Sequence, residues 1–579
     1  YMKFVSVKRS LFLCLFLVSG FAFAQDPIDS ETVTVVKPYS PSVREASKIK
    51  AVPGKADSVS TTKKSVKYNI FSVPVASTFT PVKGRATRVE RVRPPKAYDN
   101  YATLGLGNYT NVLAEFYSNI EVNRDQNFGV YLLHNSSQGG IDGVLLDNKF
   151  YDTSLNLNYG SKDRDYSWNT ELGVQHQLFN WYGISENVPM TDAEILTTVD
   201  PQQNYYSVFG GGNIELYDSF FKTADLEIRQ TGDAFGTSEQ KVDLNSTLEF
   251  NIADELITTD VQANFVNGSM DRIYAENVEN KYTFLNVGVT PSLLILRNNL
   301  TLNIGAAFFY GLDTENSDSN FYLYPKVTAS YKLAGDYFTP YAGLEGGLKQ
   351  NSYYDFVQQN PYISPTIMVA PTDNLYNFYL GAKGKLTNTV SYNFRGGYNA
   401  EDVKPLFVRN VYNPDIREGY AYGNSFGVVY DNVKTLSFFA NISVDVNDNF
   451  RLGITGEFFD YDTDREQEAW NLPNYTAELT ADYQITEKWY AGANLFLVGE
   501  REAMAIVDSR PVDGGIERAF ITLDSYFDAN AHVGYRFNDQ LSAFVKGSNL
   551  LNNDYQRWSD FQVQGIQVLG GVTYKFDYN

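Results

Sequence analysis

Histidine is the side chain most often used for acid–base chemistry near neutral pH, and this chain of 579 residues has only three. His134, His176 and His532 lie far apart in the sequence, without the close spacing that would hold a metal ion. Nucleophilic catalysis needs a base within reach of the nucleophile, and no Ser-x-His pair occurs. We therefore predict that the protein is not an enzyme and that these histidines belong to structural strands.

Two runs of carboxylates are the other candidates for ion binding. They are Asp460, Asp462, Asp464 and Glu466 in one run, and Asp313, Glu315 and Asp318 in the second. Loop carboxylates suit calcium, but the spacing of an EF-hand loop is missing. Solvated loop faces are the preferred interpretation and calcium binding is the alternative, so we predict no metal site and no cofactor.

Aromatic side chains are concentrated in the long polar connections. Examples are Tyr353, Tyr354, Phe356, Tyr362, Phe407, Tyr412 and Trp470. Some could stack on a sugar or dock a partner protein, and belts at a membrane interface explain many others. The net charge of -21 argues against nucleic-acid binding.

Residues 1–24 have the pattern of an export signal. A basic start precedes the apolar stretch 11–18, and Ala22-Phe23-Ala24 forms a small-x-small cleavage site. The apolar stretch is too short to span a membrane as a helix, and no later segment reaches 18 consecutive apolar residues. Cys14, the only cysteine, lies inside that stretch, so we expect the exported chain to have no disulfide and no thiol chemistry.

From about Asn100 the chain alternates apolar and polar residues, as half-buried strands do. In residues 529–537, for example, Ala, Val, Tyr and Phe fall on one face, and Asn, His and Arg fall on the other. Short polar turns alternate with long connections, such as residues 401–424 and 501–524, which is typical of transmembrane barrels. Merging residues 420–445 into one long strand gives about 22 strands. We predict an all-β, antiparallel up-and-down barrel over residues 99–579.

Residues 25–98 differ from the barrel in charge and in pattern. They carry 14 lysines and arginines against 6 acidic residues, whereas residues 99–579 carry 30 against 62. Eight prolines and few core-forming residues predict an extended periplasmic segment that becomes ordered through contact with a partner. Its last part is strongly basic, with Lys83, Arg85, Arg88, Arg91, Arg93 and Lys96. This part could seal an acidic lumen, or it could bind periplasmic or membrane-surface partners.

The last two strands of the barrel resemble those of TonB-dependent receptors. The similarity lies in Asn549-Leu550-Leu551-Asn552-Asn553-Asp554-Tyr555 and in Gly570–Phe576, where Tyr574 and Phe576 form the C-terminal strand signal. The resemblance implies a location in the bacterial outer membrane, contact with its lipid, and recognition by the barrel-insertion machinery. One departure is large, because residues 25–98 show no pattern of a folded plug.

A second similarity concerns Glu31, Thr32, Val33, Thr34, Val35 and Val36. This segment looks like a TonB box, which pairs as a strand with the energy-coupling protein. The alternative is an ordinary extended segment with high strand propensity.

These similarities imply a receptor- or transporter-like barrel for uptake, which could be energy-coupled or assisted by another envelope protein. The alternative function is a structural or accessory subunit of the outer membrane that anchors a periplasmic docking arm. Pull-down with residues 25–98 would separate the two hypotheses.

Overall fold

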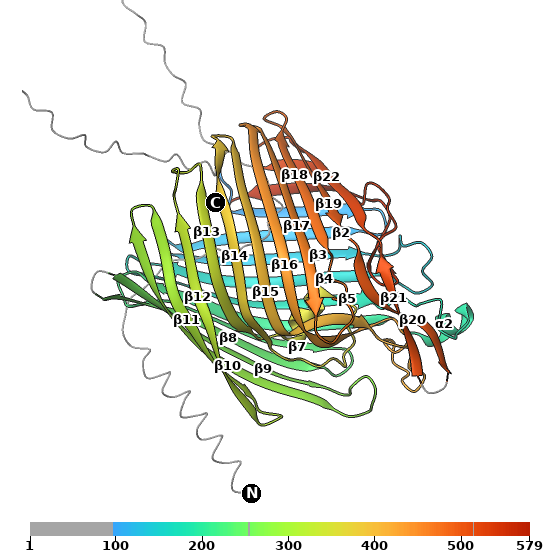
Figure 1. The fold of residues 1–579 in the computed structure, drawn as a ribbon. Helices are drawn as coiled ribbons and strands as arrows, with labels where there is room; N and C mark the ends of the chain where they lie inside the picture. Colours follow the sequence, from blue (N-terminus) through green and yellow to red (C-terminus); the bar gives the residue numbers. More distant parts are fainter. Residues whose placement is uncertain (1–95, 253–254, 513–514, 579) are drawn as a thin grey trace, which may run out of the picture. The chain divides into compact units, whose positions relative to one another are not determined.

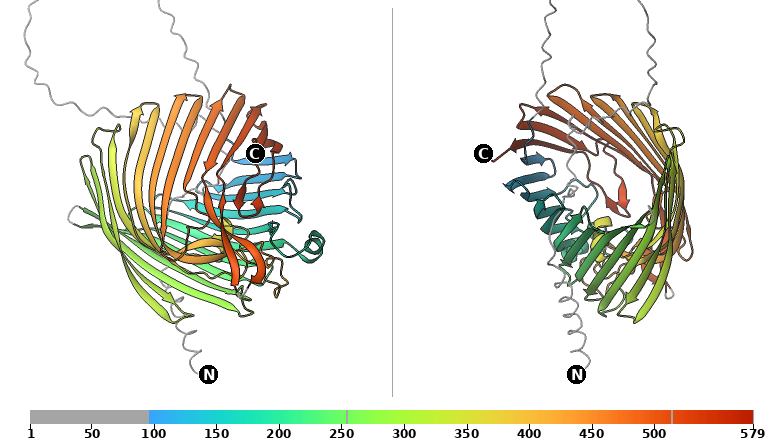
Figure 2. Two further views of the ribbon diagram at one scale, coloured as in Figure 1. Left: turned by 45° about the vertical axis from the view of Figure 1, so that its right-hand side comes forward. Right: turned by 90° about the vertical axis from the view of Figure 1, so that its left-hand side faces the viewer.

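A computed structural model describes residues 96–252, 255–512 and 515–578. In these residues 22 antiparallel strands form one closed sheet, which confirms the predicted barrel (Figures 1 and 2). Closure joins the first strand to the last. Thr103 lies opposite Thr573, and their hydroxyl oxygens are 2.9 Å apart.

The wall strands are β1 (Asn100–Gly107), β2 (Val112–Asn123), β3 (Gln126–Ser137), β4 (Phe150–Lys162), β5 (Tyr166–Asn180), β6 (Gln202–Leu216), β7 (Phe221–Asp233), β8 (Ser238–Ile252), β9 (Glu255–Met270), β10 (Asn280–Arg297), β11 (Leu300–Asp313), β12 (Asp318–Tyr331), β13 (Thr339–Lys349), β14 (Thr372–Thr387), β15 (Val390–Arg409), β16 (Phe426–Asn447), β17 (Phe450–Thr463), β18 (Tyr475–Gln484), β19 (Trp489–Val498), β22 (Tyr526–Arg536), β23 (Leu541–Ser548) and β26 (Gln567–Phe576).

Two hairpins are not part of the closed sheet. They are β20 (Arg501–Val512) with β21 (Gly515–Leu523), and β24 (Gln556–Trp558) with β25 (Phe561–Gln562). The two described helices are α2 (Asp192–Thr198) and α3 (Tyr353–Gln359). Neither helix, nor any other in the described part of the chain, has the length and apolar character needed to cross a membrane.

The outward face of the wall is apolar. In β22, Phe527 and Val533 are exposed on one face, whereas Asp528 on the opposite face is buried. Exposed large apolar side chains recur around the barrel, for example Leu104, Leu172, Val208, Ile228, Leu244, Val289, Phe308, Leu323, Leu380, Phe394, Phe438 and Val572. A lipid-facing wall requires such a belt.

This apolar belt ends at a row of polar residues. Gln230, Gln240, Asn267 and Thr283 lie opposite one another on β7 to β10. The Asn267 amide donates to the Thr283 hydroxyl at 2.8 Å. Gln230 follows the exposed, outward-facing Ile228 by two residues. The row marks the level at which the wall leaves the apolar layer.

Short turns lie at one end of the barrel and longer loops at the other. The predicted single long strand within residues 420–445 is confirmed as β16. The predicted long connection 401–424 is wrong at its start, because β15 continues to Arg409 and pairs with β16 across a bulge between Glu401 and Lys404. The predicted connection 501–524 contains the β20–β21 hairpin.

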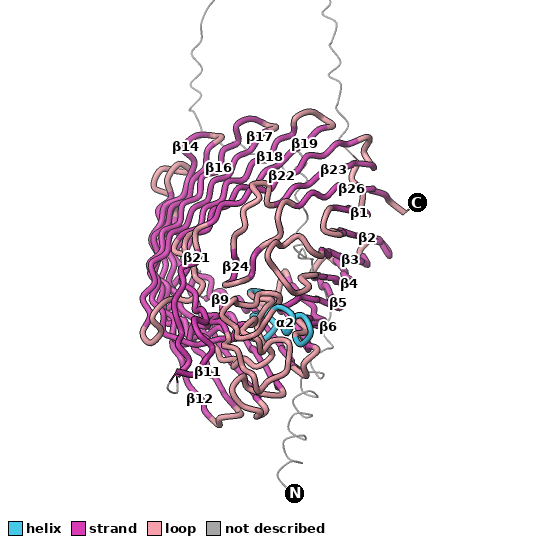
Figure 3. The backbone as a smooth tube through the Cα atoms, turned by 90° about the vertical axis from the view of Figure 1, so that its right-hand side faces the viewer, coloured by secondary structure: helices cyan, strands magenta, loops and turns pink. Residues whose placement is uncertain are grey.

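We call the end with the longer loops the mouth and number its loops L1 to L11 in chain order. The loops used below are L3 (residues 181–201), L7 (350–371), L8 (410–425), L10 (499–525) and L11 (549–566). Figure 3 looks toward this end and shows loop segments between the wall strands, whereas α2 lies beyond the strand ends (Figure 1). The largest buried apolar cluster joins residues of these loops to the upper wall.

Candidate functional site

L7 folds into the barrel instead of away from it. Its helix α3 contacts inward-facing side chains of the wall. Gln358 donates to Gln177 of β5 at 3.0 Å, and Asp355 pairs with Lys241 of β8 at 3.1 Å. Lys241 lies on the face of β8 opposite to the exposed Leu244, so α3 lies on the lumen side. The structure therefore places a helix within the mouth of the lumen.

Glu239 of β8 is the central anchor of α3. Its carboxylate accepts hydrogen bonds from the backbone N–H groups of Tyr353 and Tyr354, at 2.6 and 3.1 Å. The hydroxyl of Tyr282 on β10 donates to the same carboxylate at 2.7 Å. Glu239 is 1% exposed, so these bonds satisfy a buried carboxylate and two free N–H groups of the helix start.

The side chain of Tyr353 fixes α3 at a second point. Its hydroxyl donates to Asp233 of β7 at 2.7 Å. Burial raises the pKa of Tyr353 well above the usual tyrosine value, so the hydroxyl keeps its proton and remains a donor. On the following stretch, the Tyr205 hydroxyl of β6 donates to the Pro361 carbonyl at 2.8 Å. L7 is thus held to two neighbouring strands.

Arg229 of β7 contacts α3 at Tyr354 through its guanidinium group. The group lies over the Tyr354 ring, 4.1 Å from its centroid, and over the Phe209 ring at 4.3 Å. It also pairs with Glu227 at 2.8 Å and donates to Ser207. Stacking of a guanidinium between two rings stabilises both the cation and the helix position.

The sequence of L7 explains why a helix starts and stops here. The Ser352 side chain accepts from the Asp355 N–H at 3.1 Å, which caps the first turn. The helix ends at Gln359, and its C-cap Asn360 is extended because it precedes Pro361, which disfavours helix in the residue before it. Because so short a helix is marginal alone, its stability comes from the wall contacts.

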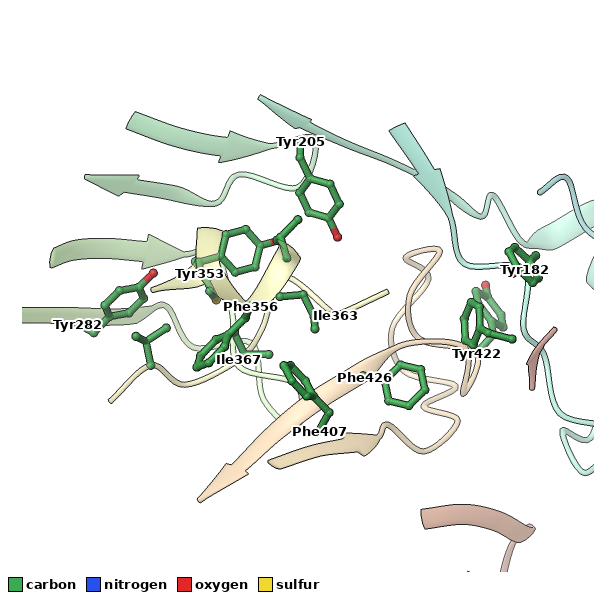
Figure 4. Packing of buried hydrophobic residues seen from close by; sticks show 14 of the residues in the cluster. Tyr182, Tyr205, Tyr282, Tyr353, Phe356, Ile363, Ile367, Phe407, Tyr422 and Phe426 are labelled. Carbon is green, nitrogen blue, oxygen red and sulfur yellow. The ribbon is translucent and has the colours of Figure 1, made fainter. Parts of the chain in front are cut away.

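An apolar cluster surrounds these polar anchors (Figure 4). Phe356 and Ile363 of L7 are fully buried, as are Val266 and Met270 of β9. Phe407 of β15 packs edge-on against Phe356, with ring centroids 5.9 Å apart. Full burial of one such side chain is worth about 1.5–3 kcal/mol, so the cluster adds substantially to the anchors.

The second half of L7 joins the other mouth loops. The Tyr362 ring stacks on Phe561 of L11 at 3.9 Å, and the Tyr362 carbonyl accepts from the Trp181 indole of L3 at 3.1 Å. Backbone bonds also link Tyr362 and Ser364 with Phe426 at the start of β16. L7 therefore connects the inner wall with a lid that the surrounding loops form.

Carboxylates are concentrated on the inward face of β4 to β9. Besides Asp233 and Glu239, they include Asp152, Glu171, Glu227, Asp243 and Asp260. Two cations of this wall, Arg229 and Lys241, are ion-paired with neighbouring carboxylates. This side of the lumen is therefore acidic.

Part of the predicted sites lies outside the described residues. This applies to the TonB-box-like segment 31–36 and to the basic segment from Lys83 to Arg93. Lys96 is described and exposed. At the other end of the chain, Tyr574 is 47% exposed on β26, and Phe576 lies opposite Asn100 of β1.

The three histidines do not gather into a site. His134 and His176 share an outward row, each opposite Thr153 of β4. His532 lies in the lumen wall, opposite Gly492. Residues 423–427 have the spacing G-x-S-x-G, but Ser425 is fully buried and its hydroxyl donates to the Tyr420 carbonyl.

The acidic runs lie only partly in loops, because Asp460 and Asp462 belong to β17, and Asp313 and Asp318 end β11 and begin β12. Asp462 and Asp464 lie 3.8 and 3.7 Å from Lys434, and Asp313 caps its own turn. Within the described ranges, no group of three or more His, Cys, Asp or Glu residues is arranged to hold a metal ion.

The predicted ligand-stacking aromatics of L7 have another role. Tyr353 and Phe356 are fully buried against the wall, so neither can stack on a solute in this state. Sequence reasoning missed the inward course of L7 and the role of Glu239. The available signal was the apolar content of residues 353–369, which is high for a solvated loop.

No family model and no curated protein matches the chain. Solved structures do match. The pyoverdine outer membrane receptor FpvA from Pseudomonas aeruginosa PAO1 superposes with a TM-score of 0.61 at 13% identity, over 84% of this chain and 80% of the receptor. The FrpB iron transporter from Neisseria meningitidis gives 0.63 at 12% identity, over 83% and 82%. The copper transporter OprC gives 0.56 at 14% identity, over 84% and 82%.

The chain has the barrel fold of these outer-membrane receptors. The resemblance predicted from the last two strands is confirmed at the level of the fold, with 22 strands and closure of β26 on β1. Whether a plug precedes the barrel concerns residues before Lys96, which lie outside the described ranges.

Proposed function

We propose that the protein is an outer-membrane receptor or transporter that takes up a solute through its lumen, with L7 controlling passage at the mouth. The observation that carries this proposal is α3, which lies on the lumen side of the wall and is anchored by Glu239. A barrel of 22 strands encloses a lumen wide enough to need an obstruction. The shared barrel fold of receptors and transporters supports the same function.

The way α3 is held suits a movable element. In the described part of the chain, the wall contacts α3 through its own side chains and not through its own backbone. These contacts are hydrogen bonds, one ion pair and aromatic packing. The strands beside it remain fully paired with one another, β7 with β8 and β8 with β9. α3 can therefore detach without opening the barrel wall.

Single-channel conductance in planar bilayers tests this function. Replacing residues 353–369 by a short Gly/Ser linker should raise the conductance several-fold, because the helix and its buried cluster leave the lumen. Shortening the β20–β21 hairpin of L10 is the matched control and should leave the conductance unchanged. Equal conductance of wild type and the L7 variant would contradict the proposal.

Energy coupling is a separate part of the proposal and rests on residues 31–36. Pairing of this segment as a strand with the energy-coupling protein would draw on its alternating Thr and Val residues. A pull-down with residues 25–98 should capture that protein, and Val33→Pro should abolish capture because proline removes a ladder N–H. Capture of other envelope proteins alone would favour the accessory role.

The basic segment from Lys83 to Lys96 is proposed to reduce leakage through the lumen. Its charge is opposite to that of the carboxylates on the inward wall. Deletion of residues 25–96 should raise single-channel conductance, in wild type and in the L7 variant alike. An unchanged conductance in both backgrounds would contradict a sealing role.

A further inference from the structure

One arginine at the mouth contacts three loops. Arg409 ends β15 and is 3% exposed. One terminal nitrogen, Nη2, donates to the Gly183 carbonyl of L3 at 2.7 Å. The Nε donates to the Gly423 carbonyl of L8 at 2.5 Å.

The remaining terminal nitrogen reaches L11. Nη1 donates to the Ser559 hydroxyl at 3.2 Å, and the same side chain pairs with Asp560. A buried guanidinium requires acceptors for its N–H groups, since each unpaired one is costly. The three loops must therefore be in place together for Arg409 to be satisfied, and removal of one loop leaves donors without partners.

We propose that Arg409 joins L3, L8 and L11 into one lid that opens as a unit. The role of this lid in uptake rests on the proposed function, whereas the joining itself is a property of the folded chain. α3 has a different set of anchors, centred on Glu239, and is expected to stay on the wall when the lid loosens. The mouth would then have two closures that open separately.

A second contact joins only two of the loops and gives a means of testing the idea. The Asn424 side-chain amide of L8 donates to the Trp181 carbonyl of L3 at 2.7 Å and to Gly419 of its own loop at 2.9 Å. Within the described part of the chain, the Asn424 side chain makes no hydrogen bond to L11. Because Arg409 keeps its bonds to all three loops, loss of Asn424 should loosen L3 and L8 only near Trp181 and Gly419, and the lid should stay closed.

Hydrogen–deuterium exchange on the full chain in lipid nanodiscs tests the proposal. Arg409→Met should speed exchange of backbone amides in L3, L8 and L11 together, by about tenfold or more, and leave α3 protected. Arg417→Met, an exposed arginine of L8, is the matched control and should change none of them. Asn424→Ala should speed exchange only near Trp181 and Gly419, where its own bonds are lost.

Faster exchange confined to L8 in Arg409→Met would overturn the proposal, and so would equal loosening of α3. If Arg409→Met fails to fold, the milder Ser559→Ala, which removes one partner of Arg409, should loosen L3, L8 and L11 together relative to Arg417→Met. No change, or loosening of L11 alone, would also overturn the proposal. These readouts do not depend on transport. If the three loops loosen together but the L7 variant conducts like wild type, the joined lid stands and only the proposed uptake function is refuted.

Discussion

L7 and L10 are both long loops at the mouth, yet they fold in opposite ways. L7 sends α3 into the lumen, where Tyr353 and Phe356 are fully buried. L10 forms its own hairpin, in which β20 pairs with β21 and Phe520 stays 47% exposed (Figure 1). Loop length therefore does not decide whether a loop enters the barrel.

The difference lies in how each loop satisfies its backbone groups. In L10 the backbone groups of the two strands satisfy each other, for example at Ala503 and Ile521, so the wall supplies apolar packing around Met504 rather than backbone partners. The start of α3 has free N–H groups, and the wall supplies Glu239 as their acceptor. A buried carboxylate on the lumen face thus defines where L7 docks.

Among the substitutions that test this contrast, Phe356→Ala is expected to weaken the docking of α3 on the wall the most. Truncation of a fully buried phenylalanine costs about 3–5 kcal/mol, here as the free energy that holds α3 on the wall. Hydrogen exchange of the α3 amides should show the corresponding loss of protection. Phe520→Ala in L10 should leave α3 protected, and equal effects of the two substitutions would remove the contrast.

Glu239→Ala should produce the next largest effect. It leaves the N–H groups of Tyr353 and Tyr354 without their acceptor, at a cost of about 2–3 kcal/mol. Amide exchange in α3 should rise accordingly. Glu502→Ala in β20, whose carboxylate accepts from the Thr522 hydroxyl, should have no effect on α3. An intact α3 in Glu239→Ala would show that the apolar cluster alone holds L7.

Lys241→Met should have the smallest effect. It removes the ion pair with Asp355 but keeps much of the side-chain volume, so the expected loss is about 1 kcal/mol. Lys434→Met, which removes a more exposed lysine near Asp462 and Asp464, is the control and should not alter α3 exchange. A loss as large as that of Glu239→Ala would mean that charge pairing is a principal anchor of L7.

Much of the wall could be predicted from the sequence, because a strand between lipid and lumen alternates with period two. Alternating segments such as Ala529 to Arg536 located the strands, and merging residues 420–445 into the single strand β16 gave a count of about 22. The end of β15 was missed because Val403 and Lys404 lie at a bulge that interrupts the alternation.

The site was harder to predict because its partners are distant in the sequence. Glu239 lies in a strand as one of many alternating polar residues, and only the closed barrel brings it to Tyr353. The partners of Arg409 are also distant in the sequence, because they lie in L3, L8 and L11. Local periodicity defines which face a side chain occupies, but it does not define which loop will meet that face.

Chemical cross-linking between α3 and the wall tests the central claim most directly. The exported chain is expected to contain no other cysteine, so Gln177→Cys with Gln358→Cys gives a clean pair. A short bis-maleimide should join this pair in the membrane, whereas Gln177→Cys with Thr522→Cys in L10 should give no product. Absence of the first product, while both cysteines still react with a monofunctional maleimide, would contradict the placement of L7 inside the barrel.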